Sequence, residues 1–245
     1  MPSIRLFVED DLAEGNVIGL ERAQSHYLTH VMRQKTGDEL RLFNGRDGEW
    51  RCEIDGTGRG WCSVSIKEQT RDVTTGPDIW LLFAPVKRAR IDFIAAKATE
   101  LGVAVLQPVF TDHTAVSRVN TERLRANAVE AAEQCGALSV PEVRGALTLS
   151  DMLAGWPANR KLIVCDETGD AEPMLEALAR EKDVIAWAIL IGPEGGFSAS
   201  ELDRIRQSSN FIPVSLGPRI LRADTAAIAA LTCWQAVLGD WAAGR

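Results

Sequence analysis

The hydrophobic pattern of the chain changes near residue 75, and this change restricts the folds that the chain can adopt. Before it, apolar and polar residues alternate in short segments that turn-forming residues separate. After it, nearly continuous apolar runs alternate with segments of helical spacing. A period of two is typical of half-buried strands, whereas apolar runs between helices are typical of a parallel sheet covered on both faces. We therefore expect a small β domain followed by an α/β domain.

The first part of the chain is expected to form a small β-barrel. Its short strands are predicted at 4–8, 39–44, 49–54 and 61–66. Turn formers at 45–48 and 55–60 separate the last three strands, and a short helix is predicted at 25–33. Closely spaced strands joined by tight turns favour a barrel.

The second part is expected to be an α/β domain with a mostly parallel sheet. We interpret the polar segment 69–78 as a linker, so the two domains are predicted to cover 1–72 and 73–245. The predicted strands lie at 80–86, 103–110, 161–167, 187–192 and 211–216. The predicted helices lie at 91–102, 121–136, 172–182, 198–209 and 223–241. Ser198 and Glu201 are expected to form a capping box at the start of one of these helices.

Composition excludes several classes of protein. No uninterrupted apolar run reaches the length of a membrane span, and the N-terminus lacks the layout of a secretory signal, so we expect a cytoplasmic protein. The five cysteines are scattered without a C-x-x-C pair, which argues against a disulfide framework and a structural zinc site. The three histidines include no H-E-x-x-H motif, and we expect no metal.

The formal net charge of −7 argues against a protein that coats nucleic acid nonspecifically. It is compatible with one focused basic face. We expect a basic cleft for RNA that contains Lys87, Arg88, Arg90, Arg118, Arg123 and Arg125. Replacing Arg88 and Arg90 by alanine should then weaken RNA binding and leave cofactor affinity unchanged. The alternative is that both clusters are solvated helix faces.

Two glycine-containing loops, at 191–198 and 216–226, each lead from a buried strand to the start of a helix. Ligands of open α/β sheets bind beyond the carboxyl ends of the strands, and glycine lets the backbone approach a flat ligand closely. Neither loop is a P-loop or a dinucleotide-binding fingerprint. The loops therefore indicate a ligand site. The alternative is that they are two tight turns that merely join a strand to a helix, since such turns can have the same sequence pattern.

Five segments carry motifs that are highly specific in combination. They are HYLTHVMRQKTGDELRLFNGRDGEW at 26–50, KRARIDFIAAKATELGV at 87–103, EAAEQCGALSVPEV at 130–143, IGPEGGFSASE at 191–201 and LGPRILRADTA at 216–226. Together they resemble the RsmE type of RNA methyltransferases, which belongs to the SPOUT superfamily. The resemblance covers nearly the whole chain.

The resemblance implies a fold, a reaction and a partner. It implies a PUA-like N-terminal barrel that binds RNA and an α/β methyltransferase domain with a trefoil knot near its C-terminus. The reaction would transfer a methyl group from S-adenosylmethionine to N3 of a uridine in 16S ribosomal RNA of the small subunit. The family is homodimeric, and the last helix, with Trp234 and Trp241 on a broad apolar surface, is expected to form the interface.

The resemblance places the cofactor in the two loops, and the chemistry of the reaction suggests roles for their charged residues. The expected cofactor-binding residues are Ile191, Gly192, Pro193, Gly195, Gly196, Leu216, Gly217, Ile220 and Leu221. Glu194 and Asp224 are the expected bases or sulfonium partners, and Arg222 is expected to steady the uracil oxygens. The alternative for Arg222 is a salt bridge with Asp224 or Glu194.

Three positions depart from the common pattern of the family. Ala96 replaces a frequent glutamine, and Asp224 replaces a common glutamate with retention of charge. Ala137 replaces a frequent arginine, which leaves one RNA contact of the family unassigned here. Two other functions stay open: a SPOUT ribose 2′-O-methyltransferase that acts on transfer RNA, and a non-catalytic RNA-binding assembly factor.

Overall fold

The computed structural model describes residues 4–74, 76–166, 171–181, 184–208 and 210–241. The chain divides into two compact units. The first unit comprises residues 1–75 together with 132–140, and the second comprises 76–131 together with 141–245. The first unit is therefore discontinuous in sequence, whereas the sequence pattern predicts two contiguous domains, 1–72 and 73–245.

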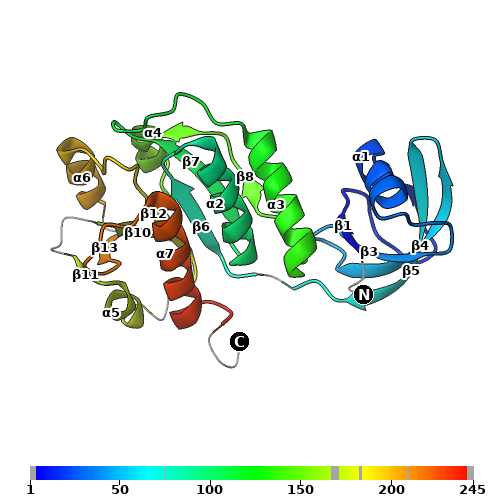
Figure 1. Cartoon of the computed structure of the whole chain (residues 1–245). Helices are drawn as coiled ribbons and strands as arrows, with labels where there is room; N and C mark the ends of the chain where they lie inside the picture. The colour runs from blue at the N-terminus through cyan, green and yellow to red at the C-terminus, as the bar shows by residue number, and fades with distance from the viewer. Residues whose placement is uncertain (1–3, 75, 167–170, 182–183, 209, 242–245) are drawn as a thin grey trace. The chain divides into compact units, whose positions relative to one another are not determined.

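The first unit is built on a five-stranded sheet (Figure 1). Its strands are β1 (Arg5–Phe7), β2 (Val17–Gly19), β3 (Glu39–Phe43), β4 (Glu49–Gly58) and β5 (Trp61–Arg71). The spatial order is β1-β3-β4-β5-β2, in which β1 and β3 are parallel and the other pairs are antiparallel. Helix α1 (Arg22–His26) continues into a π-helix, η1 (Tyr27–Val31). Inward-facing Leu28, Leu42, Ile54 and Ile66 belong to one buried cluster.

Two sequence predictions for this unit are wrong in detail. The predicted turn at 55–60 lies mostly within β4, and only Arg59 and Gly60 form the turn of the β4–β5 hairpin. The indole of Trp61 covers Gly56 and Gly58, so these glycines make room for a ring rather than for a bend. The predicted linker at 69–78 begins too early, because β5 continues to Arg71 and pairs with β4 there.

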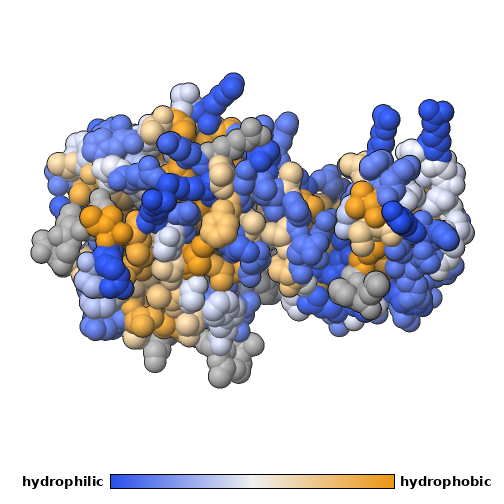
Figure 2. All heavy atoms as spheres, in the orientation of Figure 1, coloured by the Kyte–Doolittle hydropathy of each residue, from blue (hydrophilic) through white to orange (hydrophobic). Residues whose placement is uncertain are grey.

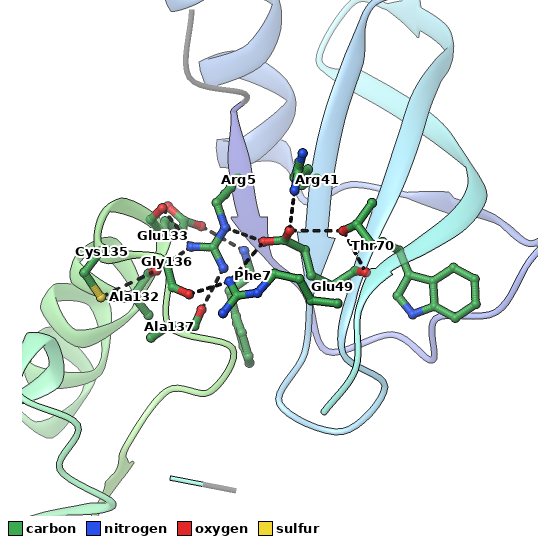
Figure 3. Close-up of polar contacts among 12 residues, drawn as sticks. Arg5, Phe7, Arg41, Glu49, Thr70, Ala132, Glu133, Cys135, Gly136 and Ala137 are labelled. Atoms are coloured by element: carbon green, nitrogen blue, oxygen red, sulfur yellow. Dashed lines mark hydrogen bonds and ion pairs between the residues drawn. The ribbon is translucent and has the colours of Figure 1, made fainter. Parts of the chain in front are cut away.

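Residues 132–140 attach to the first unit through Arg5. The guanidinium of Arg5 donates hydrogen bonds to the carbonyl oxygens of Ala132, Glu133 and Ala137, at 2.7 to 3.1 Å (Figure 3). A carboxylate oxygen of Glu133 in turn accepts a hydrogen bond from the backbone N–H of Phe7. These bonds satisfy carbonyl groups at the end of a helix that otherwise lack partners.

The second unit contains a parallel sheet of order β11-β13-β10-β12-β6-β7-β8, and β9 pairs with β7 off this path. Its strands are β6 (Ile79–Phe83), β7 (Val105–Phe110), β8 (Glu142–Val143), β9 (Leu147–Thr148), β10 (Lys161–Cys165), β11 (Glu172–Pro173), β12 (Trp187–Ile191) and β13 (Phe211–Ser215). Every recorded pair is parallel. The predicted parallel α/β sheet and its five main strands are confirmed.

Helices cover both faces of this sheet. They are α2 (Arg88–Glu100), α3 (Thr121–Cys135), α4 (Leu149–Ala154), α5 (Met174–Ala179), α6 (Ala199–Arg206) and α7 (Ala223–Val237). Helix α7 packs against α2, α5, β6 and β12 (Figure 1). Met152 of α4 and Ile205 of α6 pack in one buried cluster with Leu162 and Leu190 of the sheet. None of the helices among the described residues has both the length and the apolar character that crossing a membrane requires.

Several helix boundaries differ from the sequence predictions. The predicted helix at 172–182 starts only at Met174, because Glu172 and Pro173 form β11 and pair with β13. The predicted helix at 223–241 ends at Val237, so Trp241 lies beyond it. The capping box of Ser198 and Glu201 is confirmed. Residues 167, 182 and 209, the predicted ends of three elements, lie outside the described residues.

Candidate cofactor pocket

A pocket lies at the carboxyl ends of three adjacent strands, β10, β12 and β13. It is lined by Cys165, Asp166, Ile191, Gly192, Pro193, Glu194, Gly196, Phe197, Leu202, Leu216, Gly217, Arg219, Ile220, Leu221, Ala223 and Ala226. The parallel order of the sheet brings these ends to one edge, which is where α/β proteins bind ligands. Both glycine loops therefore contribute to one pocket.

Eight of the nine predicted cofactor residues line this pocket, and Gly195 is the exception. The carbonyl oxygen of Gly195 instead lies against His113. Ile220 lines the pocket but is 83% exposed, so it lies at the mouth. The structure thus brings together two loops that are separated in sequence by α6 and β13.

The loop conformations depend on glycine at specific positions. Gly196 has φ +68° and Gly217 has φ +107°, backbone conformations that other residues rarely adopt. A Cβ atom at Gly192 would lie 2.9 Å from the ring of Phe197, which also lines the pocket. The backbone itself therefore forms part of the pocket wall.

The predicted acidic and basic residues of the loops have different surroundings. Glu194 forms an ion pair with Arg90 in the first turn of α2. Asp224 lies in the first turn of α7, where one carboxylate oxygen accepts a hydrogen bond from the N–H of Thr225. Arg222 is the N-cap residue of α7 and is exposed. Among the described residues it forms no ion pair, so the predicted alternative of a salt bridge with Asp224 or Glu194 is not realised.

Strand β10 also contributes to the pocket, which the sequence did not predict. Cys165 ends this strand and Asp166 follows it, and both line the pocket. Burial raises the pKa of the Cys165 thiol to about 12, and the nearby Cys233 adds to the shift. Cys165 is therefore a neutral, apolar part of the wall and no nucleophile. The strand itself was predicted from its apolar run, but the sequence does not show that β10 lies between β12 and β13, and this position is what brings its end to the pocket.

The predicted RNA-binding cations fall into three groups. Lys87 and Arg118 are exposed, and neither forms an ion pair among the described residues. Two of them form ion pairs: Arg123 forms a bidentate pair with Asp92, with N–O distances of 2.7 and 2.8 Å, and Arg90 pairs with Glu194. Arg125 is exposed and interacts with other groups, and the side chain of Arg88 lies outside the description.

This arrangement bears on one expectation from the sequence. The loss of Arg90 was expected to leave cofactor affinity unchanged, because this residue lies outside the two glycine loops. Its ion pair with Glu194 instead connects it to the first glycine loop.

Models of two known protein families match the chain. A model of the RNA methyltransferase domain matches residues 74–235, and a model of the RNA methyltransferase PUA domain matches residues 20–67. These two ranges fall on the α/β part and on the small β part of the chain, respectively.

Curated relatives match over nearly the full length. The chain is 34% identical over 228 residues to the ribosomal RNA small subunit methyltransferase E of Rickettsia conorii. This match covers 93% of each protein. It is 32% identical to the protein of the same name from Synechocystis, over 96% of this chain and 78% of that protein.

Solved structures share the fold. A putative methyltransferase of Legionella pneumophila, in complex with the cofactor SAM, superimposes with a TM-score of 0.89 at 29% identity and covers 98% of this chain and 100% of that one. The ribosomal RNA small subunit methyltransferase E of Neisseria gonorrhoeae, bound to S-adenosyl methionine, gives a TM-score of 0.84 at 26% identity with the same coverage.

Proposed function

Because the chain belongs to the RNA methyltransferase domain family, we propose that it transfers a methyl group from S-adenosylmethionine to N3 of a uridine in 16S ribosomal RNA of the small ribosomal subunit. One observation carries the proposal: both glycine loops line a single pocket, in a fold shared with two methyltransferases that were solved with this cofactor. The relatives named above act on ribosomal RNA of the small subunit by name.

The pocket suits S-adenosylmethionine in shape and chemistry. Ile191, Leu216 and Leu221 offer apolar walls for an adenine ring, and the exposed peptide groups of the loops can pair with its edge. The lack of a side chain at Gly192 lets the ring of Phe197 pack against the loop backbone at the pocket. When bound, the cofactor supplies the methyl group on its sulfonium.

The transfer requires that uracil N3 loses its proton as the new N–C bond forms. Of the three charged candidates, Glu194 is paired with Arg90 and is therefore less available as a proton acceptor. Asp224 is half-buried at the N-terminus of α7 and is our candidate base. Arg222, exposed beside it, can donate hydrogen bonds to uracil oxygens and stabilise the imide anion. Holding the reacting atoms in line is the main task of the site.

RNA would be held by the exposed cations of the second unit and by the PUA-like barrel. Lys87 and Arg118 are the strongest candidates for phosphate contacts, because neither is neutralised by a described carboxylate. The paired Arg123 is a weaker candidate. Base identity would be read only where an unstacked uracil enters the pocket.

The assembly that we propose is a homodimer in the cytoplasm, with a trefoil knot around the two glycine loops. Trp234, one of the two predicted interface residues, is only 2% exposed and belongs to the core of its own subunit. The interface would therefore use other apolar side chains of this unit, of which Leu175 and Trp241 are each 54% exposed.

Two experiments separate this function from its alternatives. Calorimetry with S-adenosylmethionine should show binding, whereas a non-catalytic assembly factor would give no heat. Ribosomal RNA from a strain without this protein should lack one base methylation that the parent strain carries, as read by nuclease digestion and mass analysis. Loss of a ribose methyl group, or of a methyl group from transfer RNA only, would favour the ribose methyltransferase instead.

A further inference from the structure

The turn between β7 and α3 has a fixed shape. The N–H of Thr114 donates to the carbonyl oxygen of Thr111 at 3.0 Å, and the N–H of Thr111 donates to Oγ1 of Thr114 at 2.9 Å. The two threonine hydroxyls lie 2.9 Å apart. These bonds close the turn and leave Asp112 and His113 at its tip.

Asp112 fastens this tip to the start of α6. Its N–H donates to Oε1 of Glu201 at 2.8 Å, and its Oδ2 accepts a hydrogen bond from Oγ of Ser198 at 2.7 Å. Ser198 and Glu201 are the capping box of α6, and Glu201 is only 5% exposed. The first glycine loop ends at this capping box, so the turn is fixed against the end of the loop.

His113 contacts the loop itself. Its Nδ1 lies 3.0 Å from the carbonyl oxygen of Gly195 and 3.1 Å from that of Gly196. Carbonyl oxygens only accept hydrogen bonds, so Nδ1 carries the proton and shares it between the two. The fit is close, because a Cβ atom at Gly195 would lie 3.2 Å from Cβ of His113.

The two carbonyl groups belong to the most adaptable residues of the loop. Gly195 and Gly196 are adjacent, and glycine loses more conformational freedom on ordering than any other residue. Gly196 lines the pocket and has φ +68°, whereas His113 does not line it. A group that holds both carbonyl oxygens restricts the loop to one conformation before the cofactor arrives, and this reduces the entropy lost on binding.

We propose that His113 is a positioning residue that holds the first glycine loop in the conformation that binds S-adenosylmethionine. The inference rests on the proposed function and adds a residue from outside both loops. It acts through the backbone of the loop, so it affects cofactor affinity and leaves the RNA contacts unchanged.

The test compares two substitutions of this histidine in the full chain. His113→Ala removes the donor and should weaken S-adenosylmethionine binding about tenfold, because a hydrogen bond to the loop is lost and the loop becomes more mobile. His113→Asn retains an N–H donor as many bonds from Cα as Nδ1 and should restore most of the affinity. His30→Ala, an exposed histidine of the first unit, is the control and should bind normally.

Calorimetry gives the dissociation constant, and steady-state kinetics should show a raised KM for S-adenosylmethionine with little change in kcat or in the KM for RNA. Normal cofactor affinity in His113→Ala, or equally weak binding in His113→Asn, would overturn the proposal. The proposed function would stand in either case, because the wild-type protein would still bind the cofactor. A raised KM for RNA alone would make His113 an RNA contact and also overturn it. If the wild-type protein binds no S-adenosylmethionine, the proposed function and this inference both fall.

Discussion

The ion pair of Arg90 and Glu194 shows how much of the pocket depends on single side chains from distant positions. Arg90 was predicted from a local run of positive charges, and Glu194 from a loop motif. Neither pattern contains the other residue, so their pairing could not be predicted from the sequence. The glycines were predictable, because a strand followed by a glycine-containing turn and a helix already indicates a ligand site. The contacts of His113 were not, since a lone histidine carries no such pattern.

Arg90→Ala should weaken S-adenosylmethionine binding by up to about fivefold, because it frees Glu194 of the first glycine loop. The pair is partly exposed, so its contribution is about 0.2–1 kcal/mol. Lys87→Ala, one turn away and without a described partner, is the matched control. It should leave cofactor affinity unchanged and lower the salt slope of RNA binding by about one. Calorimetry and RNA binding across a salt series measure both, and identical behaviour of the two variants would contradict this division.

Gly196→Val should abolish S-adenosylmethionine binding. Valine adds a branched side chain to the pocket wall, and φ of +68° at this position strains any residue other than glycine. Gly15→Val is the control for strain, because Gly15 has φ +84°, lies in the first unit and has no atom near its Cβ position. Calorimetry should show binding only in the control, with similar melting temperatures. Unchanged affinity in Gly196→Val would refute the assignment of the pocket.

Strands and helices were predictable where the pattern was strong and less so at their ends. The five apolar runs of the second unit became strands, and the capping box began its helix where expected. Strand β5 continues through polar residues because β4 offers a partner there, and no local pattern shows that partner. Short elements such as α4 escaped prediction, because a few residues give too little periodicity.

Glu49 of β4 provides a test of how the first unit is held together. Its side chain is 1% exposed and accepts hydrogen bonds from Arg5, Arg41 and Thr70 (Figure 3). Burial alone would raise its pKa, but the hydrogen bonds from Arg41, Arg5 and Thr70 and the charge of Arg5 together lower it. A carboxylate whose pKa is lowered on folding stabilises the fold above its unfolded pKa, and this contribution is lost as pH falls through the folded value.

Glu49→Gln should therefore destabilise the full chain by about 3 kcal/mol at pH 7, at the lower end of the range for broken buried pairs because the amide still accepts hydrogen bonds. The difference from wild type should shrink as pH falls below the ordinary glutamate pKa of 4.5. Urea unfolding at several pH values measures this. Glu39→Gln, whose side chain is 60% exposed and pairs with Arg51, should change stability by less than about 1 kcal/mol. A pH-independent difference for Glu49→Gln would contradict the account.

The division of the chain into two parts was predictable from the sequence, but the membership of residues 132–140 in the first unit was not. The change of pattern near residue 75 predicted two parts, and the structure has two units. Residues 132–140 join the first unit through long-range contacts such as those of Arg5, whose carbonyl partners lie 127 to 132 residues away. Hydrophobic periodicity contains no information over such separations. The PUA-like barrel and the methyltransferase fold followed from resemblance, and the knot stays a prediction.

The protein should be a dimer in solution. Figure 2 shows apolar side chains gathered on the second unit over α7 and its neighbours. Leu175, Ile220 and Trp241 are each more than half exposed in the single chain, and exposed apolar patches commonly mark interfaces between proteins. Light scattering at micromolar concentration should give twice the chain mass. A monomer under these conditions would count decisively against the homodimer.

The most direct test of the central claim is methyl transfer to small ribosomal subunits from a strain that lacks this protein. The purified protein, given S-adenosylmethionine with a labelled methyl group, should label these subunits and leave subunits of the parent strain unlabelled. Digestion to nucleosides should yield the label as N3-methyluridine from 16S ribosomal RNA. Label on a ribose or in transfer RNA would contradict the account. It would also be contradicted if wild type transferred no label and so did not differ in this assay from Gly196→Val.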